Sequence, residues 1–367
     1  MIKNKQSRKI IAALAGMACT GPVFAQSSVT LYGMMDTGIT WVSNQGGHRN
    51  LKMDDGVNGP NLWGLQGTED LGGGTKAFFQ LTNQFQVDNG SFMPNKSLFS
   101  RTSIVGLSNA TFGKMTLGNQ YDFMTDSLYF SGDDPAELSG HFYDFRAGPV
   151  TKLALPNNPT GAFDWDRMAG ETVNNAVKYT SPTIGGFSAG AMYSFGNVAG
   201  SIGTGNGSSF ALNYASQNFG VNAAYTNLKY VVTGEGDVSV RNWGIGAHYR
   251  FGGWTTNALF TTVHNSYNGA SVYQGSVGAH YYFTPALSAG ASYMYMKGND
   301  VVDNNHAHQV AAIVDYALSK RTSVYVLGVY QRASAGGFAQ INGMNSADGA
   351  SSGQAQAVAR VGLHTHF

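Results

Sequence analysis

Apolar and polar residues alternate with a period of two along most of this chain. In the stretch 187–195, Phe187, Tyr193 and Phe195 share one face with two alanines, and the other face carries serine, glycine and methionine. Such alternation predicts a β-strand whose two faces meet different surroundings. Segments of about 10 residues are long for ordinary strands but suit strands that cross a bilayer at a tilt. The same pattern recurs in the ranges 210–214, 243–251, 273–283 and 287–295.

Turn signals separate these segments, and the connections come in two lengths. Seven short turns alternate with eight longer, polar loops, so fifteen connections join sixteen strands. The short turns fall at Leu71–Gly74, Asn109–Gly113, Pro182–Gly186, Gln217–Gly220, Gly252–Gly253, Thr284–Leu287 and Leu318–Arg321. The longer loops fall at about 43–60, 88–96, 122–171, 196–207, 231–239, 264–271, 297–306 and 333–353. The predicted fold is therefore all-β, a 16-stranded antiparallel transmembrane β-barrel with short periplasmic turns and long outer loops.

The polar face of the strands decides between this barrel and a secreted β-sandwich. A sandwich would bury its apolar face in a dry core and turn its polar face to solvent. Here the apolar face is rich in aromatic residues at the strand ends, and the other face consists of Ser, Gly, Gln, Asn, Lys and Arg. Sixteen strands with such a face suit a wet lumen better than a sandwich.

Composition excludes several other classes of protein. Only 12% of the residues are charged, about half of the usual share in soluble domains. The 21 Phe, 19 Tyr and five Trp exclude a disordered chain. The longest apolar run, Ile10–Ala18, is too short for a membrane-spanning helix, which needs about 20 residues.

The first 25 residues follow the order of a secretory signal peptide. Basic residues from Lys3 to Lys9 precede the apolar run, and the small-residue site Val23–Ala25 follows it. We therefore expect a signal peptide at 1–25 and one β-barrel domain at 26–367. Removing the four basic residues turns the formal net charge from +1 into −3, and the single cysteine, Cys19, leaves with the signal. The mature chain then has no disulfide framework and no thiol nucleophile, and its charge predicts no nucleic-acid partner.

Four stretches and the last residue carry a resemblance to a known family. They are Ser28–Gly33, Trp63–Gly74, Asn175–Pro182, Asp315–Tyr325 and the terminal Phe367. In these the chain resembles the trimeric general porins of Gram-negative bacteria, in their betaproteobacterial branch, over nearly the whole mature length. The resemblance implies an outer-membrane channel for passive diffusion of ions and small hydrophilic solutes. It also implies a homotrimer among outer-membrane lipids, with no cofactor.

The longest loop, 122–171, runs for 50 residues without strand alternation, a length that is unusual unless the loop is functional. In porins the third loop folds into the barrel and narrows it, and the resemblance implies this for 122–171. Asp134, Pro135 and Glu137 have the spacing of a helix start, so a short helix is expected near Asp134. The loop has a net charge of −6, and we expect its acidic residues to form one wall of the constriction. The residues proposed for this wall are Asp122, Asp126, Asp133, Asp134 and Glu137.

The facing wall is expected to be basic. Arg101 begins a run that resembles the family segment whose arginine projects into the pore. Lys76, Lys178 and Arg360 fall on the lumen face by strand parity, although parity does not fix their height in the barrel. Opposed charges across a narrow, water-filled gap orient polar solutes and set ion preference.

The chain departs from its family at three positions that matter for ion preference. Gln66, Asn119 and Thr172 stand where many relatives carry arginine. This departure leads to the hypothesis that ion selectivity is weak, with a tilt towards cations.

Two other functions stay open at this point, a solute-specific channel and a barrel enzyme. The sequence around Ser188 matches the G-x-S-x-G motif of a nucleophile elbow, but a strand rather than a helix is predicted after the serine. Two H-x-H pairs, His306/His308 and His364/His366, put both imidazoles on one strand face with no third metal ligand apparent. We therefore predict neither a catalytic group nor a metal site. A sugar-specific channel would show a ladder of aromatic residues in the lumen, whereas most aromatics here fall on the lipid face.

Overall fold

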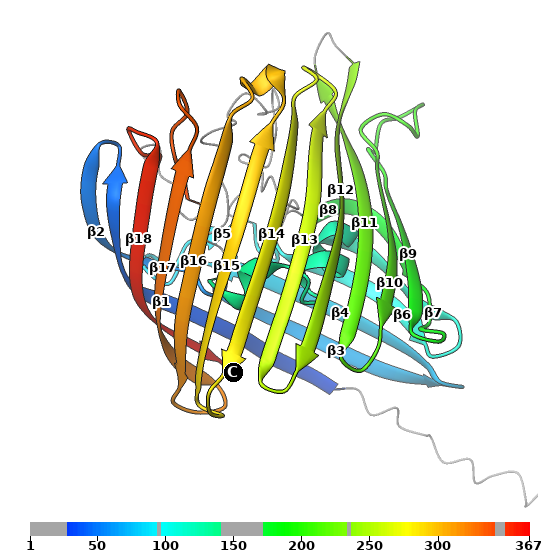
Figure 1. The fold of residues 1–367 in the computed structure, drawn as a ribbon. Helices are drawn as coiled ribbons and strands as arrows, with labels where there is room; N and C mark the ends of the chain where they lie inside the picture. Colours follow the sequence, from blue (N-terminus) through cyan, green and yellow to red (C-terminus); the bar gives the residue numbers. More distant parts are fainter. Residues whose placement is uncertain (1–27, 94–96, 141–171, 233–235, 342–348) are drawn as a thin grey trace, which may run out of the picture.

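A computed structural model describes residues 28–93, 97–140, 172–232, 236–341 and 349–367 of the chain. Its strands form one closed antiparallel sheet, because the first strand pairs with the last over the register Met34–His366 to Val42–Val358 (Figure 1). The strands are β1 (Ser28–Gln45), β2 (His48–Asp55), β3 (Leu62–Gly72), β4 (Thr75–Phe85), β5 (Phe92–Met93), β6 (Thr102–Asn109), β7 (Gly113–Tyr121), β8 (Thr172–Thr180), β9 (Phe187–Ser194), β10 (Gly207–Ala215), β11 (Phe219–Val232), β12 (Gly236–Phe251), β13 (Trp254–Asn265), β14 (Ser271–Tyr282), β15 (Leu287–Gly298), β16 (His306–Ala317), β17 (Thr322–Ala333) and β18 (Ala355–His366). Three short helical turns, η1 (Thr125–Tyr129), η2 (Pro135–Leu138) and η4 (Asp300–Val302), complete the described elements.

These strands make a barrel of sixteen. β2 pairs with the second half of β1 and β3 with its first half, so the two act as one barrel strand that is interrupted at 56–61. β5 is a two-residue strand within a loop, paired with the end of β4. The sixteen strands predicted from the alternation are thereby confirmed, and so are the positions of the seven short turns.

The prediction of a loop at 43–60 is wrong for most of its length. β1 continues to Gln45, and β2 starts at His48 after a two-residue turn. That turn is made by Gly46 and Gly47, whose φ values of 58° and 96° lie in the left-handed region that glycine adopts without strain. Paired left-handed residues are the conformation that joins two antiparallel strands tightly, so the hairpin extends where a loop was expected.

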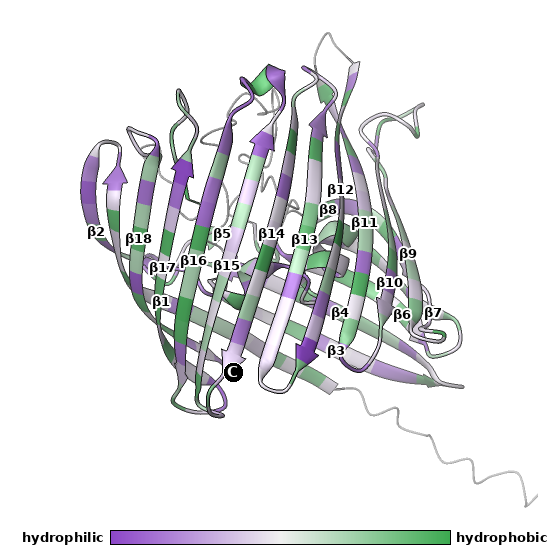
Figure 2. Cartoon of the chain, viewed as in Figure 1, coloured by the Kyte–Doolittle hydropathy of each residue, from purple (hydrophilic) through white to green (hydrophobic). Residues whose placement is uncertain are grey.

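The barrel is apolar outside and polar inside. Val326 on the outward face of β17 is 57% exposed, whereas its neighbour Tyr325 points inward and is 2% exposed. Large apolar residues such as Val105 and Leu107 are exposed in the same way, and Figure 2 shows the resulting alternation of hydrophobic and hydrophilic residues along the strands. Among the described residues, no helix has the length and apolarity to cross a membrane.

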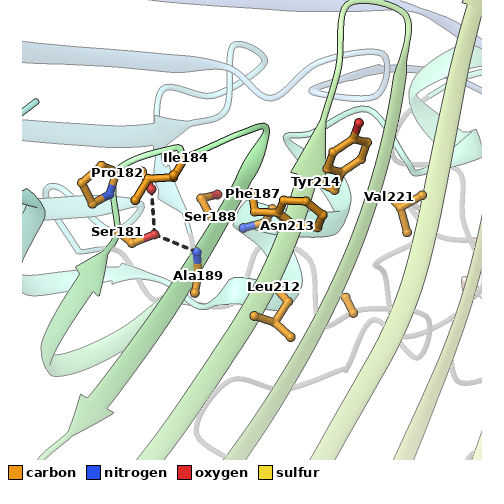
Figure 3. Close-up of a pocket in the computed structure, with 11 residues that line it drawn as sticks. Ser181, Pro182, Ile184, Phe187, Ser188, Ala189, Leu212, Asn213, Tyr214 and Val221 are labelled. Atoms are coloured by element: carbon orange, nitrogen blue, oxygen red, sulfur yellow. Dashed lines mark hydrogen bonds between the residues drawn. The ribbon is translucent and has the colours of Figure 1, made fainter. Parts of the chain in front are cut away.

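The outward face is not smooth. A shallow groove lies over the ends of β8 to β11 near the short turns, where Pro182, Phe187, Leu212 and Tyr214 surround a floor that includes Ala189 (Figure 3). Phe187 and Leu212 are largely exposed in this groove. Its lining is almost entirely apolar, as is expected of a surface that faces lipid tails.

Residues 122–140 fold into the lumen and lie against the inner wall, where η1 and η2 contact strands from β10 to β15 (Figure 1). The short helix predicted near Asp134 is confirmed as η2, a single 3-10 turn. The Asp134 carboxylate accepts a hydrogen bond from the Ala136 amide at 2.9 Å, and Pro135 occupies the first helical position. A proline at this position loses no helical hydrogen bond, which explains why the turn begins there.

Candidate functional site

The inward-folded segment 122–140 approaches the wall closely because several facing strand residues are glycines. A Cβ atom at Gly190 of β9 would lie 2.1 Å from the Phe123 ring. A Cβ atom at Gly290 of β15 would lie 1.7 Å from the carbonyl oxygen of Leu138. No side chain larger than hydrogen fits at either place without displacing the loop. The glycines therefore form the seat on which the loop rests.

Buried carboxylates fasten the loop to this seat. Asp133 is fully buried and accepts a hydrogen bond from Asn222 Nδ2 of β11 at 2.8 Å. Its other oxygen lies 2.6 Å from Nδ1 of His248 on β12. Burial raises the pKa of Asp133, and the contacts with His248 and Asn222 oppose that rise. This carboxylate joins the loop to two neighbouring strands.

Asp122 makes a second anchor at the start of the loop. Thr226 Oγ1 of β11 donates to Asp122 Oδ2 at 2.5 Å, and the Thr125 amide donates to Oδ1 at 3.0 Å. Burial raises the pKa of Asp122 to about 6, because its charged form loses hydration that the two hydrogen bonds replace only in part.

Asp134 is also fully buried, and the amide of Asn257 on β13 donates to its main-chain carbonyl at 2.8 Å. Three of the five acidic residues that we expected on the open wall, Asp122, Asp133 and Asp134, thus direct their carboxylates away from the water-filled space. The reason is local. Side chains of the wall donate to Asp122 and Asp133, and the turn that Asp134 caps supplies the donor to one oxygen of its carboxylate.

Among the residues predicted for the two walls, Asp126 and Lys178 form an ion pair. Lys178 Nζ of β8 lies 2.5 Å from Asp126 Oδ2 and donates to the Tyr121 carbonyl at 2.9 Å. The same ammonium lies 5.2 Å from the centre of the Phe123 ring. The Lys178 side chain is mostly buried, whereas that of Asp126 is 34% exposed. The pair therefore presents its acidic member to the lumen.

Glu137 lies on η2 and is half-buried. Its carboxylate and the guanidinium of Arg250, from the inward face of β12, both lie near the backbone of Gly132. Sequence reasoning did not single out Arg250, although it has the same parity as His248 on that strand.

Arg101 stands one residue before β6. Its amide donates to the Thr82 carbonyl at 3.1 Å, and its Nε donates to Gln84 Oε1. Gln84 belongs to the inward face of β4, so the Arg101 side chain is held on the lumen side. Lys76 has the same parity but lies eight residues from Gln84 along β4, a distance of about 27 Å. It is exposed beside the Gly73–Gly74 turn, and the structure does not bring it to Arg101.

Arg360 points inward as parity predicted, but it is 1% exposed and enclosed in a hydrogen-bonded network. Its Nε donates to Tyr325 Oη at 2.7 Å, and its Nη2 donates to Asp36 Oδ1 at 3.0 Å. A further ion pair joins Nη1 to Asp54. Arg360 therefore has a place in the wall rather than in the open lumen that we expected.

The segment 56–61 between β2 and β3 encloses this network. Its Val57 amide donates to Asp36 Oδ1 at 3.0 Å, and Asn61 Oδ1 accepts from the Asp36 amide at 2.7 Å. The Val57 side chain packs with Tyr325 and Leu327 in an apolar cluster on the inner face. Sequence reasoning missed Asp36, although closure of the barrel sets β1 beside β18 and parity puts Asp36 on the same face as Arg360.

A gap of about 300 Å³ remains between η1 and the opposite wall. Side chains from β1, β3, β4, β6 and β7, most of them polar, line it together with Asp126, Phe130 and Lys178. Lys114, which the sequence analysis did not select, enters the gap from β7 with its Nζ 5.1 Å from the centre of the Phe78 ring. The other residues that line the gap are Tyr32, Leu62, Gln80, Thr82, Thr102, Ile104, Thr116, Gln120 and Tyr121.

The three positions that depart from the family pattern have different surroundings. Gln66 pairs in register with Gln80, so it shares the lumen face. Asn119 Nδ2 and Thr172 Oγ1 both donate to the Ser100 carbonyl, at 3.0 and 3.3 Å. These two side chains satisfy a main-chain carbonyl at the edge of the loops.

The sequence motifs that resemble a catalytic serine or a metal site do not have the surroundings that either function requires. Ser188 is the second residue of β9, and the strand continues to Ser194 where a nucleophile elbow requires a helix. His306 and His308 lie side by side on β16 with ring centres 6.0 Å apart. Within the described residues, no group of three metal-binding side chains converges.

Comparisons with known proteins agree with this architecture. A family model described as Gram-negative porin matches residues 11–336. The chain is 31% identical over 337 residues to outer membrane porin protein 32 of Delftia acidovorans, which covers 87% of this chain and 88% of that protein. It is 30% identical over 276 residues to an outer membrane porin protein of Bordetella pertussis, with coverage of 67% and 66%.

Two solved structures share the fold. The anion-selective porin from Comamonas acidovorans has a TM-score of 0.77 at 23% identity and covers 93% of this chain and 100% of that one. The trimer form of OmpT from Vibrio cholerae has a TM-score of 0.63 at 14% identity, with coverage of 93% and 99%.

Proposed function

Because this chain belongs to the Gram-negative porin family, we propose that it is a general diffusion channel whose narrowest part is the gap beside η1. The chain is an outer-membrane porin, and ions and small hydrophilic solutes pass its water-filled lumen passively. The observation that supports the position of the constriction is the lining of the gap, in which Asp126, Lys114 and the wall amides and hydroxyls all present polar atoms to one space.

The gap favours a general channel over a solute-specific one. A specific sugar channel needs a row of aromatic rings along the path, whereas the gap holds only Tyr32, Tyr121 and Phe130 among its lining residues. Swelling of liposomes that contain the protein tests this choice, with arabinose, glucose and raffinose as solutes. We expect uptake rates that fall smoothly with solute size and do not saturate. Saturation by one of the sugars would favour the solute-specific alternative.

For ion preference, we propose a modest selectivity for anions in place of the tilt towards cations. Two basic side chains, Lys114 and Lys178, line the gap, and among the described residues that line it Asp126 is the acidic one. Buried carboxylates such as Asp133 are held by the wall. The loop residues 141–171 add four acidic and three basic residues, a net charge of only −1. The neighbour from Comamonas acidovorans is named as anion-selective, which agrees with this proposal.

We further propose that three copies associate through the outward face of β1 and β2. Leu31, Ile39, Leu51 and Met53 are all more than half exposed there, which makes an extended apolar patch. OmpT of Vibrio cholerae, which has this fold, is described in a trimer form. An unheated sample on a detergent gel is expected to run as an oligomer and to run as a monomer after boiling. A monomer before boiling would contradict the trimer while leaving the channel function untouched.

A further inference from the structure

A row of basic side chains crosses the outward face of the barrel near the long-loop ends of β12 to β17. The row, which we call the basic rim, consists of Arg241, His264, Lys297, His306, His308 and Arg332. Strand parity places each of them outside, because the residues next to them in the chain are buried on the inner face. In Figure 2 hydrophilic colouring accordingly appears at the loop ends of β15, β16 and β17.

The register between neighbouring strands sets the basic residues of the rim beside one another. Arg241 is directly opposite His264 on the next strand. Further along, Lys297 is opposite His306, and His308 is opposite Arg332. Neighbouring strands lie about 4.8 Å apart, so each basic group is within reach of the next across the sheet.

The rim stands at the level where lipid headgroups begin. Trp243 follows Arg241 on the same face, and Tyr330 precedes Arg332 in the same way; they are 45% and 47% exposed. Tyr273, which is also exposed, pairs in register with Lys297. Outward aromatic residues of this kind mark the boundary between the acyl chains and the headgroups of a bilayer. Arg241 and Arg332 lie two residues nearer the long loops than their aromatic neighbours, and Lys297 lies level with Tyr273.

The charges of the rim have no acidic partner in the part of the chain that the structure describes. No carboxylate there lies within 4.0 Å of Arg241, Lys297 or Arg332. A nearby pair shows the contrast, since Lys229 of β11 lies 3.8 Å from Asp237. Three permanent positive charges are therefore free to meet an anion at the membrane surface.

An apolar groove leads up to the rim from the membrane side. It crosses the outward face of β9 to β12 with a volume of about 560 Å³, and small residues such as Ala189 and Ala223 form its floor. Phe210 and Leu212 border it, and its upper end is formed by Trp243, two residues from Arg241. An acyl chain that lies in this groove would bring its headgroup to the start of the basic rim.

We propose that this face of the barrel binds a lipid with a phosphate-bearing, anionic headgroup. The headgroup phosphate contacts the basic rim, where arginine guanidinium groups bind phosphate oxygens through two parallel hydrogen bonds. The acyl chains lie along the outward strands below it. Such binding would hold the barrel at a fixed height in the leaflet at its long-loop end. His306 and His308, which form no metal site with a third ligand, gain a role as polar members of the rim.

Native mass spectrometry of the detergent-solubilised full-length protein tests the proposal. The probes are phosphatidic acid and phosphatidylcholine with identical acyl chains, so that only the headgroup charge differs. The test variant carries Lys297→Gln and Arg332→Gln, which removes the two permanent charges that flank the histidines. The control variant carries Lys320→Gln and Arg321→Gln in the short turn between β16 and β17, which removes the same charge at the opposite end. Wild-type conductance in a planar bilayer serves as the check that each variant has folded.

We expect the wild type to bind phosphatidic acid more tightly than phosphatidylcholine. The test variant is expected to lose about 10- to 30-fold of its affinity for phosphatidic acid, and the control variant less than about twofold, given the usual contribution of a basic residue near a charged membrane surface. Equal affinity of the wild type for the two lipids, or equal loss in both variants, would overturn the proposal.

Two further measurements distinguish binding of the lipid from binding of free phosphate. They use the wild-type protein, so they do not depend on the folding of a variant. Inorganic phosphate is added as a competitor, and displacement of the lipid by phosphate at equal concentration would overturn the commitment to a lipid. The affinity of the wild type for phosphatidic acid is also measured against NaCl concentration. We expect it to fall steeply with salt because the contact is ionic, and an affinity that does not change with salt would overturn the role of the basic rim.

Discussion

Lys178 of β8 and Asp126 of the inward-folded loop lie 2.5 Å apart, Nζ to Oδ2, at the edge of the luminal gap. The basic and the acidic walls expected from the sequence therefore touch at this point, where we had expected them to face each other across water. The contact neutralises two charges and fixes the loop against the strand side of the gap. Ion preference then depends on the other charges at the gap, Lys114 among them.

Breaking this pair is expected to move ion preference in opposite directions. Asp126→Asn leaves the Lys178 charge uncompensated and should raise the ratio of chloride to potassium permeability about twofold, the order expected of one unit charge beside an ion path in water when salt screens it. Lys178→Gln should lower the ratio by a similar factor. Reversal potentials in a KCl gradient measure both. The double variant should return close to the wild type, and equal shifts of the same sign in the two single variants would contradict the ion pair.

The seat of the loop can be tested at a glycine. Gly290→Ala places a methyl group where the Leu138 carbonyl now lies, 1.7 Å from the new atom, so the loop must move into the lumen. We expect a lower single-channel conductance and more frequent closures. Gly328→Ala on β17 is the matched control, because nothing lies within 4 Å of its added methyl group. Identical conductance in the two variants would show that the loop does not rest on β15.

The buried carboxylate of Asp122 predicts a pH dependence of stability. Its pKa is raised by burial to about 6, above the ordinary value of about 3.9. Between those values the folded protein holds a proton that the unfolded chain does not, so stability increases as the pH falls from 7 to 5, by about 1 kcal/mol for this group. Asp133, also raised by burial, acts in the same direction. Thermal unfolding in detergent at the two pH values measures the gain, and Asp122→Asn should show a smaller one. A gain of the same size in Asp122→Asn would remove Asp122 as its source.

Arg360 is expected to affect stability rather than permeation. Arg360→Gln leaves the buried carboxylate of Asp36 without its cationic partner, and such losses cost about 3–5 kcal/mol. The midpoint of heat unfolding in detergent should fall clearly, while the reversal potential should stay at its wild-type value in the protein that remains folded. Lys76→Gln, at an exposed position, should leave the midpoint unchanged. A large change in reversal potential with unchanged stability would show that Arg360 acts in permeation and not in stability.

The strand pattern predicted the barrel well because period-two alternation and turn residues are local properties of the chain. The break in the wall at 56–61 was not predictable in this way. The segment folds inward over Asp36 of β1, whose partner Arg360 is on β18, and β18 lies beside β1 only after the barrel closes. For the same reason, a run of acidic residues in a loop looked like a charged surface. Whether a carboxylate such as that of Asp133 faces water or a wall depends on partners more than 80 residues away, here Asn222 and His248.

Strand parity was more reliable for direction than for environment. It put Arg360, Lys178 and Lys76 on the inner face, where all three lie. It carried no information on height, which separates Lys76 from the gap, or on neighbours, which bury Arg360 in the wall. Lys114 could have been found by the same parity, because it lies two residues from Thr116 on the inward face of β7.

The reversal potential of the wild-type channel in a tenfold KCl gradient at pH 7 tests the central claim most directly. If the acidic anchors of the loop are turned into the wall and Lys114 and Lys178 outnumber Asp126 at the gap, the sign of the potential will show chloride passing more readily than potassium, by a modest factor. A preference for potassium would contradict this account, because it would mean that acidic residues dominate the constriction.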